Sequence, residues 1–288
     1  MKISVISIKN KKHLALYNNG KLALLDDYGI NKTALKDLNE NDFSKIRNVD
    51  DFSEYNFKYE SLIDKTSNLF LVGLNYRSHI NETHGKIPED PVIFSKTNNT
   101  FCGNNRTIEI DENMNIDYEG ELCVMIGKKA SNVNENDALN YVYGYFIGND
   151  ISSRLMQFKT PQWFIGKSFD NFYPTGQYIS VEEIDNPQNL ELKTYLNDEL
   201  RQNSSTENMI YSVKKLISYI SKYITLEIGD CISTGTPSGV ILGMPEDKRK
   251  YIKSGDEVRV YLNPPDLGNI KRLPDLPLVR NLPSTALS

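Results

Sequence analysis

The amino-acid sequence predicts a mostly β protein of the α+β class that carries only a few helices. Apolar runs of strand length recur from residue 69 onward, and clusters of turn-forming residues separate them. Helical periodicity is clear in only a few places. The length of 288 residues suits one large domain, or one domain with a small companion.

Short strands dominate the N-terminal part of the prediction. Residues 1–30 hold apolar stretches with turns at "NNG" and "DDYG". Residues 31–65 are polar and contain one short predicted helix near "TALKDL". We therefore predict a small N-terminal domain at residues 1–65 and a larger domain at residues 66–288.

The larger domain begins with the apolar stretch "NLFLVGLNY". Helices are predicted at "NENDALNYV", which an asparagine caps, and at "NMIYSVKKLISYISKYI", whose apolar residues recur three and four apart. From "NPPDLG" onward the chain is rich in proline and forms either an extended wrap-around tail or a partly disordered one. The predicted strands are Leu69–Leu74, Val92–Phe94, Leu122–Ile126, Val142–Ile147, Tyr178–Val181, Leu190–Leu196 and Val258–Leu262.

Composition argues against several classes of protein. The net charge of -5 lacks the basic excess of nucleic-acid-binding proteins. Apolar stretches fall short of the ~20 residues that span a bilayer, and the N-terminus lacks the apolar core of a signal peptide. The three cysteines form neither a disulfide framework nor a zinc pattern. We therefore predict a cytosolic protein that binds neither nucleic acid nor membrane.

Two glutamates stand at the start of a strongly apolar run, in "MNIDYEGELCVMIGKK". Glu119 and Glu121 are two residues apart, so in a strand they point to the same face and repel each other. Asp150 ends the next apolar run, "YVYGYFIGND", and joins them if the two strands are neighbours. Three carboxylates suit Mg²⁺ or Mn²⁺. The alternative is that both glutamates are solvated charges where a strand begins.

Three further motifs carry chemistry, each with a structural alternative. Lys167, in "WFIGKSFDNFYPTG", could neutralise an anionic substrate or an oxyanion, or lie on a surface turn. The small residues of "CISTGTPSGVILG" would let a ligand approach the backbone. The alternative is a structural turn. His79 and Glu82 meet if they lie in a short helical turn, where Glu82 would orient His79 as a general base. The alternative is an ordinary pair of surface side chains.

The order of these motifs resembles the fumarylacetoacetate hydrolase family. The resemblance runs through "VGLNYRSHINE", "DYEGELCVMIGK", "YVYGYFIGNDISSR", "GKSFDNFYPTG" and "LEIGDCISTGTPSGV", over roughly residues 69–262. It implies a mixed β-sandwich roll in a homodimer, and residues 1–65 are similar to the small variable domain of many members. The resemblance also implies roles for individual residues: Glu119, Glu121 and Asp150 hold Mg²⁺ or Mn²⁺, Lys167 faces the substrate, His79 and Glu82 lie on a lid, and Arg154, Gln157 and Thr236 contact the substrate.

The sequence departs from this family in two places. Arg154 is followed by Leu155 rather than by the aspartate of "SARD", so the side chain that supports Arg154 is expected to differ. The C-terminal stretch keeps only a trace of the strand near "GLGTLTN" that relatives carry. From spacing alone, Arg154 and Gln157 could also be surface residues that follow a strand.

The function that the resemblance implies is metal-dependent hydrolysis of a C–C bond in a small 2-oxo acid of the acylpyruvate or fumarylpyruvate type. His79, tuned by Glu82, would deprotonate a water, and Lys167 would stabilise the enolate that leaves. The same site could instead serve an isomerase, a decarboxylase or a dehydratase of 2-oxo-3-deoxy sugar acids. A different class of function is a non-catalytic homodimer that binds a metal and a small acid.

Overall fold

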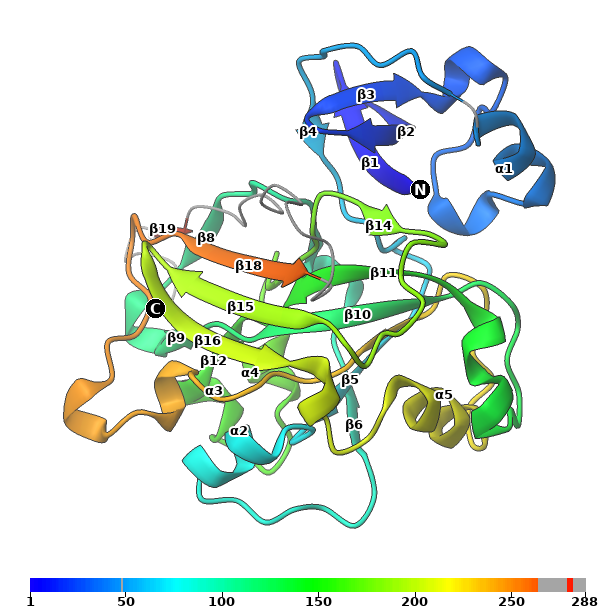
Figure 1. Ribbon diagram of the computed structural model, residues 1–288. Coiled ribbons are helices and arrows are strands. Elements are labelled where there is room, and N and C mark those ends of the chain that lie inside the picture. Colours follow the sequence, from blue (N-terminus) through cyan, green and yellow to red (C-terminus); the bar gives the residue numbers. More distant parts are fainter. Residues whose placement is uncertain (48, 264–278, 282–288) are drawn as a thin grey trace.

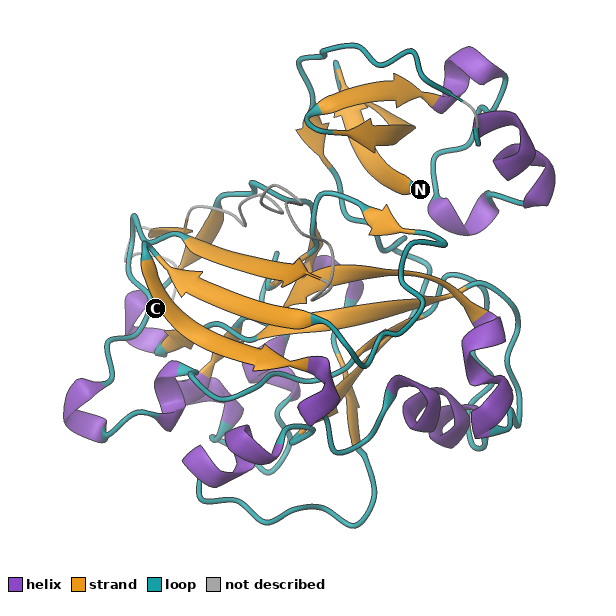
Figure 2. Ribbon diagram, viewed as in Figure 1, coloured by secondary structure: helices purple, strands orange, loops and turns teal. Residues whose placement is uncertain are grey.

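Strands are the main regular secondary structure of the protein, and short helices lie around them (Figures 1 and 2). The computed structural model describes residues 1–47, 49–263 and 279–281. The predicted fold class, mostly β with a few helices, is confirmed. Among the described residues, no helix has both the length and the hydropathy to span a membrane.

A large mixed sheet runs through the molecule (Figure 1). Most neighbouring strands in it are antiparallel, but β17 and β5 are parallel. Its order is β3 (Lys21–Leu24), β2 (Lys11–Asn18), β1 (Lys2–Ile8), β14 (Ile179–Ser180), β11 (Val142–Asn149), β10 (Gly120–Ile126), β17 (Cys231–Ser233), β5 (Leu69–Gly73) and β6 (Val92–Ser95), while β4 (Lys58–Tyr59) pairs with β1.

A second sheet packs on the centre of the first. It has the order β16 (Glu199–Ser205), β15 (Glu191–Leu196) and β18 (Val258–Asn263). Gly120 lies at the contact, where an added Cβ would be 2.3 Å from Thr194 Oγ1 and 2.9 Å from Val260 Cγ1. The buried core between the layers contains Leu122, Val124, Ile126, Leu192, Val258 and Leu262.

Three short strand pairs complete the β structure. The first joins β9 (Ile116–Asp117) to β12 (Ser152–Ser153) in antiparallel register. The other two pairs are parallel: β7 (Phe101–Cys102) with β13 (Tyr173–Pro174), and β8 (Ile108–Ile110) with β19 (Val279–Asn281).

The helices are short. The α-helices are α1 (Glu40–Ile46), α2 (Arg77–Glu82), α3 (Arg154–Gln157), α4 (Phe164–Lys167) and α5 (Val213–Ser221). The 3₁₀ helices are η1 (Leu25–Tyr28), η2 (Leu35–Asp37), η3 (Asn98–Thr100), η4 (Glu112–Met114), η5 (Glu135–Tyr141), η6 (Thr206–Asn208), η7 (Ile241–Gly243) and η8 (Glu246–Lys248).

The predicted strands from residue 69 onward are all present, with ends that shift by one or two residues. The predicted helix at "NENDALNYV" is instead the 3₁₀ helix η5, and the side chain of Asn134 accepts no capping hydrogen bond. A three-residue repeat aligns Ala138, which is buried, with the partly buried Tyr141. Asn134 occupies the N-cap position as predicted, but it caps a 3₁₀ helix and does so without a side-chain hydrogen bond.

The two ends of the chain were predicted less completely. Strand β14 lies between β1 and β11, so the N-terminal strands continue the same sheet as the later ones (Figure 1). The domain boundary after residue 65 stays a prediction. Most of the proline-rich tail, 264–278 and 282–288, lies outside the described residues.

Candidate active site and metal centre

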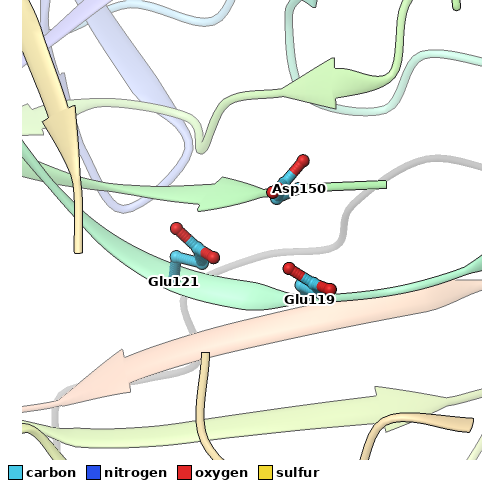
Figure 3. Close-up of side chains that lie close together, drawn as sticks. All are labelled: Glu119, Glu121 and Asp150. Atoms are coloured by element: carbon cyan, nitrogen blue, oxygen red, sulfur yellow. The ribbon is translucent and has the colours of Figure 1, made fainter. Parts of the chain in front are cut away.

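The three predicted metal ligands meet at the end of the strand pair β10–β11 (Figure 3). Gly120 pairs with Asn149, and the Asp150 N–H donates to the Glu119 carbonyl at 2.8 Å. This register brings Asp150 beside the two glutamates. One carboxylate oxygen from each of Glu119, Glu121 and Asp150 lies within 4.8 Å of the others, and all three residues are buried.

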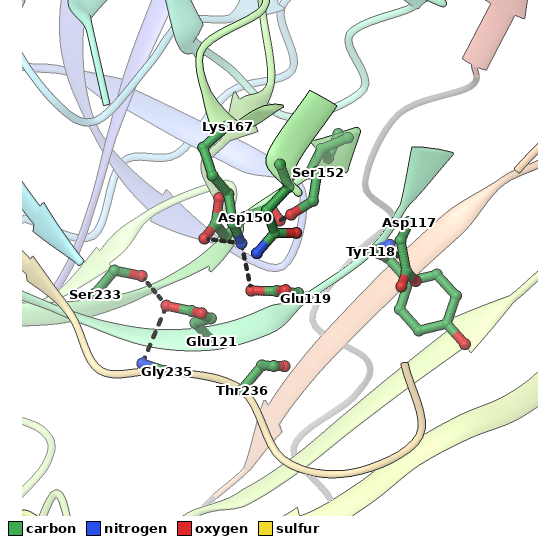
Figure 4. Close-up of polar contacts among 12 residues, drawn as sticks. Asp117, Tyr118, Glu119, Glu121, Asp150, Ser152, Lys167, Ser233, Gly235 and Thr236 are labelled. Carbon is green, nitrogen blue, oxygen red and sulfur yellow. Dashed lines mark hydrogen bonds and ion pairs between the residues drawn. The ribbon is translucent and has the colours of Figure 1, made fainter. Parts of the chain in front are cut away.

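Glu119 is surrounded by cations (Figure 4). Lys167 Nζ donates to Glu119 Oε2 at 2.8 Å and to Asp150 Oδ2 at 2.7 Å. Arg154 Nη1 lies 2.7 Å from Glu119 Oε1. Burial alone would raise the pKa of Glu119, but the charges of Lys167 and Arg154 outweigh it and lower that pKa below its usual range. Glu119 is therefore held as a carboxylate.

Glu121 has no such cation partner among the described residues. Its Oε2 accepts a hydrogen bond from Ser233 Oγ and another from Gly235 N at 3.1 Å (Figure 4). Burial, Asp150 and Glu119 together raise the pKa of Glu121 well above its ordinary value. A positive charge between these carboxylates would relieve both the repulsion and the burial cost.

The donor set around the cluster fits a divalent metal ion. All three candidate ligands are carboxylates, which Mg²⁺ and Mn²⁺ prefer. Within the described part of the chain, the carboxylates also outnumber the buried cations beside them. The acids are Asp117, Glu119, Glu121 and Asp150, and the cations are Lys96, Arg154 and Lys167.

Lys96 supports Asp150 and was not predicted. Its side chain is fully buried, and Nζ donates to Asp150 Oδ1. It also donates to the backbone oxygens of Ile151 at 2.9 Å and Phe172 at 2.7 Å. Burial lowers the pKa of Lys96 to about 8. These contacts fix the side chain of Asp150 in the cluster.

Arg154 is held mainly by Asp117, which was also not predicted. Arg154 Nε donates to Asp117 Oδ2 at 2.9 Å, and Nη2 lies 2.8 Å from the same oxygen. Arg154 Nη1 also donates to Gln157 Oε1 at 2.8 Å. Asp117 thus supplies the support that Leu155 cannot give. Asp117 further accepts from the backbone N–H groups of Ile241 and Leu242, which ties Arg154 to that loop.

The His79–Glu82 pair lies on α2. His79 Nδ1 is 2.8 Å from Glu82 Oε1, as the i, i+3 spacing predicts. The other oxygen of Glu82 accepts from the Gly239 N–H at 2.8 Å. An added Cβ at Gly243 would lie 2.4 Å from Glu82 Cδ, so any other residue there would displace the Glu82 carboxylate. Glu82 therefore orients His79 and fastens α2 to the 239–243 loop.

A cavity of about 890 Å³ brings the predicted site residues together. Phe94 and Trp163 form an apolar part of its wall, with their ring centroids 5.4 Å apart. An added Cβ at Gly73 would lie 2.6 Å from the Trp163 ring, so this glycine makes room for it. The predicted residues that line the cavity are His79, Glu82, Glu119, Glu121, Arg154, Gln157, Lys167 and Thr236.

Two local features place Lys167 and Thr236. An added Cβ at Gly166 would lie 2.4 Å from Gln157 N, so glycine lets α4 pack against α3 and carry Lys167 inward. Thr236 Oγ1 donates to the Gly120 carbonyl at 2.9 Å and accepts from Gln202 Nε2 at 2.8 Å. Thr236 is thereby fixed beside the strand that carries the glutamates.

Three buried carboxylates beside a cavity, on a mixed β fold, are an arrangement typical of enzymes that hold a metal ion. The C-terminal domain model of fumarylacetoacetate (FAA) hydrolase matches residues 68–273. The chain belongs to the fumarylacetoacetate hydrolase family.

The relatives of the chain include a tautomerase and a hydrolase. The chain is 41% identical over 217 residues to a fumarylacetoacetate hydrolase domain-containing protein 2 homolog of Dictyostelium discoideum, covering 70% of this chain and 69% of that protein. It is 40% identical over 213 residues to the oxaloacetate tautomerase YisK of Bacillus subtilis, covering 72% and 70%. A solved fumarylacetoacetate hydrolase from Exiguobacterium antarcticum superposes with a TM-score of 0.80 at 28% identity, over 98% of this chain and all of that one.

Proposed function

We propose that the chain is a divalent-metal-dependent enzyme that forms and stabilises the enolate of a small 2-oxo acid, and that oxaloacetate tautomerisation is its reaction. The observation that carries this proposal is the buried group Glu119, Glu121 and Asp150, whose two glutamates line the cavity. The substrate follows the Bacillus subtilis relative, which is named an oxaloacetate tautomerase.

The cations of the site would bind and hold the acid. A bound Mg²⁺ or Mn²⁺ ion would supply a Lewis acid that polarises the ketone. Arg154 and Gln157 line the same cavity and would bind the carboxylate of the acid. Lys167, whose pKa is raised by Asp150 and Glu119 against the effect of burial, stays charged and would stabilise the negative oxygen of the enolate.

His79 would move the proton. Its Nδ1 is held by Glu82 at 2.8 Å, which leaves Nε2 for the substrate. His79 would take the proton from carbon 3 of the keto form, and the protonated ring would then give a proton, directly or through a water, to the oxygen on carbon 2, which becomes the enol hydroxyl. In the reverse direction the same ring would return the proton to carbon 3.

Hydrolytic cleavage of a C–C bond in an acylpyruvate or fumarylpyruvate is the second candidate. A cavity of about 890 Å³ is larger than a four-carbon acid needs, since sites of about 300–1,000 Å³ take drug-sized ligands. The oriented His79 could deprotonate a water for attack on the distal carbonyl. Decarboxylation and sugar-acid dehydration would begin from the same enolate.

The test is an ultraviolet assay of the purified protein. Oxaloacetate enol, an acylpyruvate, fumarylpyruvate and a 2-oxo-3-deoxy sugar acid are each supplied with Mg²⁺, with Mn²⁺ and after chelation. We expect metal-dependent loss of the enol band without release of pyruvate. His79→Ala should lower kcat by about 10²–10⁴-fold. Glu121→Gln should lose the turnover that depends on the added metal ion.

The outcomes separate the candidates. Pyruvate release from an acylpyruvate, faster than enol loss, would replace the tautomerase with the hydrolase. Turnover that survives chelation would contradict both, because both need the metal. A wild-type protein that binds Mn²⁺ but turns over none of these acids would favour the non-catalytic reading. The homodimer and the cytosolic location stay predictions.

A further inference from the structure

A chain of buried polar side chains lies behind the candidate metal ligand Glu121. Cys123 Sγ is 2.7 Å from Tyr173 Oη, Tyr173 Oη donates to Ser233 Oγ at 2.6 Å, and Ser233 Oγ donates to Glu121 Oε2. Each of these side chains is fully or almost fully buried. None of Cys123, Tyr173 and Ser233 lines the cavity, so they do not face a substrate.

When Glu121 is ionised, as a bound metal ion would require, the hydrogen bonds of this chain run in one direction. A carboxylate only accepts, so the single hydroxyl proton of Ser233 goes to Glu121. Ser233 must then accept from Tyr173, and Tyr173 has spent its proton on Ser233. The remaining donor for Tyr173 Oη is the Cys123 thiol. Every donor therefore points toward Glu121, and hydrogen bonds aligned in this way strengthen one another.

The chain fixes the orientation of the Glu121 carboxylate. Ser233 and the Gly235 N–H both bind Oε2. The carboxylate is therefore already held in the cluster that it forms with Glu119 and Asp150. A carboxylate fixed in this way loses little freedom when an ion arrives.

The backbone makes a place for the Tyr173 hydroxyl. An added Cβ at Gly148 would lie 2.3 Å from Tyr173 Oη and 2.8 Å from Cys123 Sγ. Any other residue at position 148 would push the hydroxyl away from Ser233. This close approach is found on β11, two residues before the metal ligand Asp150.

The ring of Tyr173 makes a second contact with the same centre. Lys96 Nζ lies 5.4 Å from the ring centroid, a cation–π distance. Lys96 in turn binds Asp150 Oδ1. The hydroxyl of Tyr173 thus supports Glu121 through Ser233, and its ring supports Asp150 through Lys96.

We propose that Tyr173 is a positioning residue of the metal centre, acting on Glu121 through Ser233 and on Asp150 through Lys96. The proposal rests on the proposed metal site and goes beyond it by naming side chains that touch neither ion nor substrate. Loss of such a partner typically costs about 10–100-fold in metal affinity. Tyr173→Phe removes the hydroxyl that acts through Ser233 but keeps the ring beside Lys96, so we expect a loss of metal affinity near the lower end of this range.

The experiment measures Mn²⁺ affinity of the full chain by the electron paramagnetic resonance signal of the free ion. The variants are Tyr173→Phe, Ser233→Ala and the double variant. Tyr143→Phe is the matched control, because the Tyr143 hydroxyl is buried and makes no hydrogen bond within the described residues. We expect Kd to rise about 10-fold in Tyr173→Phe, more in Ser233→Ala, and less than about twofold in Tyr143→Phe.

The double variant tests whether the residues act in series. If Tyr173 acts on Glu121 only through Ser233, removing both hydroxyls should weaken Mn²⁺ binding no more than Ser233→Ala alone. Kd values for Tyr173→Phe and Ser233→Ala within twofold of the wild type would overturn the proposal. So would independent effects that multiply in the double variant, because they indicate two separate packing defects.

Folding is controlled separately. The Tm of each variant is measured with a chelator present, and Ser233→Ala, which removes a single oxygen, keeps the test valid if Tyr173→Phe folds poorly. A wild-type protein that does not bind Mn²⁺ would overturn the metal site and this proposal together. Wild-type binding with unchanged variants would overturn this proposal alone.

Discussion

Asp117 connects the candidate substrate arginine to the segment that holds Ile241 and Leu242. It pairs with Arg154 at 2.8 Å and accepts from the backbone of Ile241 and Leu242 at 2.9 and 3.0 Å. The Arg154 side chain and the backbone at residues 241–242 are thus both held by the Asp117 carboxylate, which is fully buried. Removing its charge would leave the guanidinium buried beside a neutral group, which is costly.

Asp117→Asn should therefore weaken both substrate binding and stability. We expect KM for the 2-oxo acid to rise by about 10-fold or more, since one lost charge-assisted hydrogen bond is worth about 1.5–3 kcal/mol. The Tm should also fall. Steady-state kinetics and thermal unfolding measure the two effects. Asp137→Asn, at an exposed position of η5, is the control and should change neither. An unchanged KM in Asp117→Asn would contradict this role for the pair.

Residues with a local pattern could be predicted, and residues with distant partners could not. Glu119 and Glu121 share a strand face, and His79 and Glu82 share a helical turn, so spacing predicted that each pair meets, whereas their roles came from the family resemblance. Asp117 continues the same acidic alternation, but its partner Arg154 is 37 positions away. Lys96, Tyr173 and Ser233 likewise gain their roles from contacts 50 or more positions apart. Their neighbours in the sequence give no sign of them.

At the scale of single elements, β10 serves two faces at once. Glu121 and Glu119, which directly precedes the strand, line the cavity, while Gly120 between them contacts the second sheet. The Gly120 N–H donates to Gln202 Oε1 at 3.1 Å. The close approach of the two sheets at Gly120 and the position of the glutamates are therefore linked.

Gly120→Ala should lower stability and metal affinity together. The new Cβ would lie 2.3 Å from Thr194 Oγ1, which forces β10 or β15 to move. Overpacking of this kind costs about 1–3 kcal/mol. Denaturant unfolding measures the free energy of unfolding. An Mn²⁺ titration measures the loss of metal affinity that a displacement of the glutamates would cause.

Two variants control this prediction. Gly176→Ala should be mild, because its added Cβ would make only ordinary contact, 3.4 Å from Ile147 Cβ. Thr194→Ala removes the clashing oxygen, which makes no hydrogen bond among the described residues, and should partly rescue Gly120→Ala. A Gly120→Ala protein as stable as the Gly176→Ala protein would show that the sheets adjust freely.

Elements were predicted well where they are long and poorly where they are a single turn. The strands from residue 69 onward follow from apolar runs bounded by turns. Helices α3 and α4 have four residues each, too few for a period to show. Helix α1 was missed although Asn39 and Asp42 form a capping box, because the surrounding polar stretch concealed that signal.

At the scale of the whole molecule, a bound ion should stabilise the fold. The central strand pair concentrates buried carboxylates that repel one another, and burial raises the pKa of Glu121. An ion that binds only the folded chain adds about 2.7 kcal/mol at 100 times its Kd. We expect Mn²⁺ to raise Tm by several degrees, and chelation to reverse the rise. Differential scanning calorimetry provides the measurement.

Glu121→Gln separates specific from general effects of the ion. This variant should be more stable than the wild type without metal, because it removes a repelling buried charge, and should gain little from Mn²⁺. Glu135→Gln, at an exposed site, should behave like the wild type. Equal stabilisation of both variants by Mn²⁺ would place the bound ion elsewhere on the molecule.

The site divides its parts unequally between the sheet and its surroundings. All three carboxylates lie at the ends of the adjacent strands β10 and β11, whereas His79, Lys167 and Thr236 come from α2, α4 and the loop after β17. Under the proposed function, changes in those outer segments would alter the acid that is accepted, or the fate of its enolate, without removing the carboxylates that would hold the ion. A scaffold arranged in this way can diversify one reaction at a time, which makes the outer segments the natural targets for engineering a new activity.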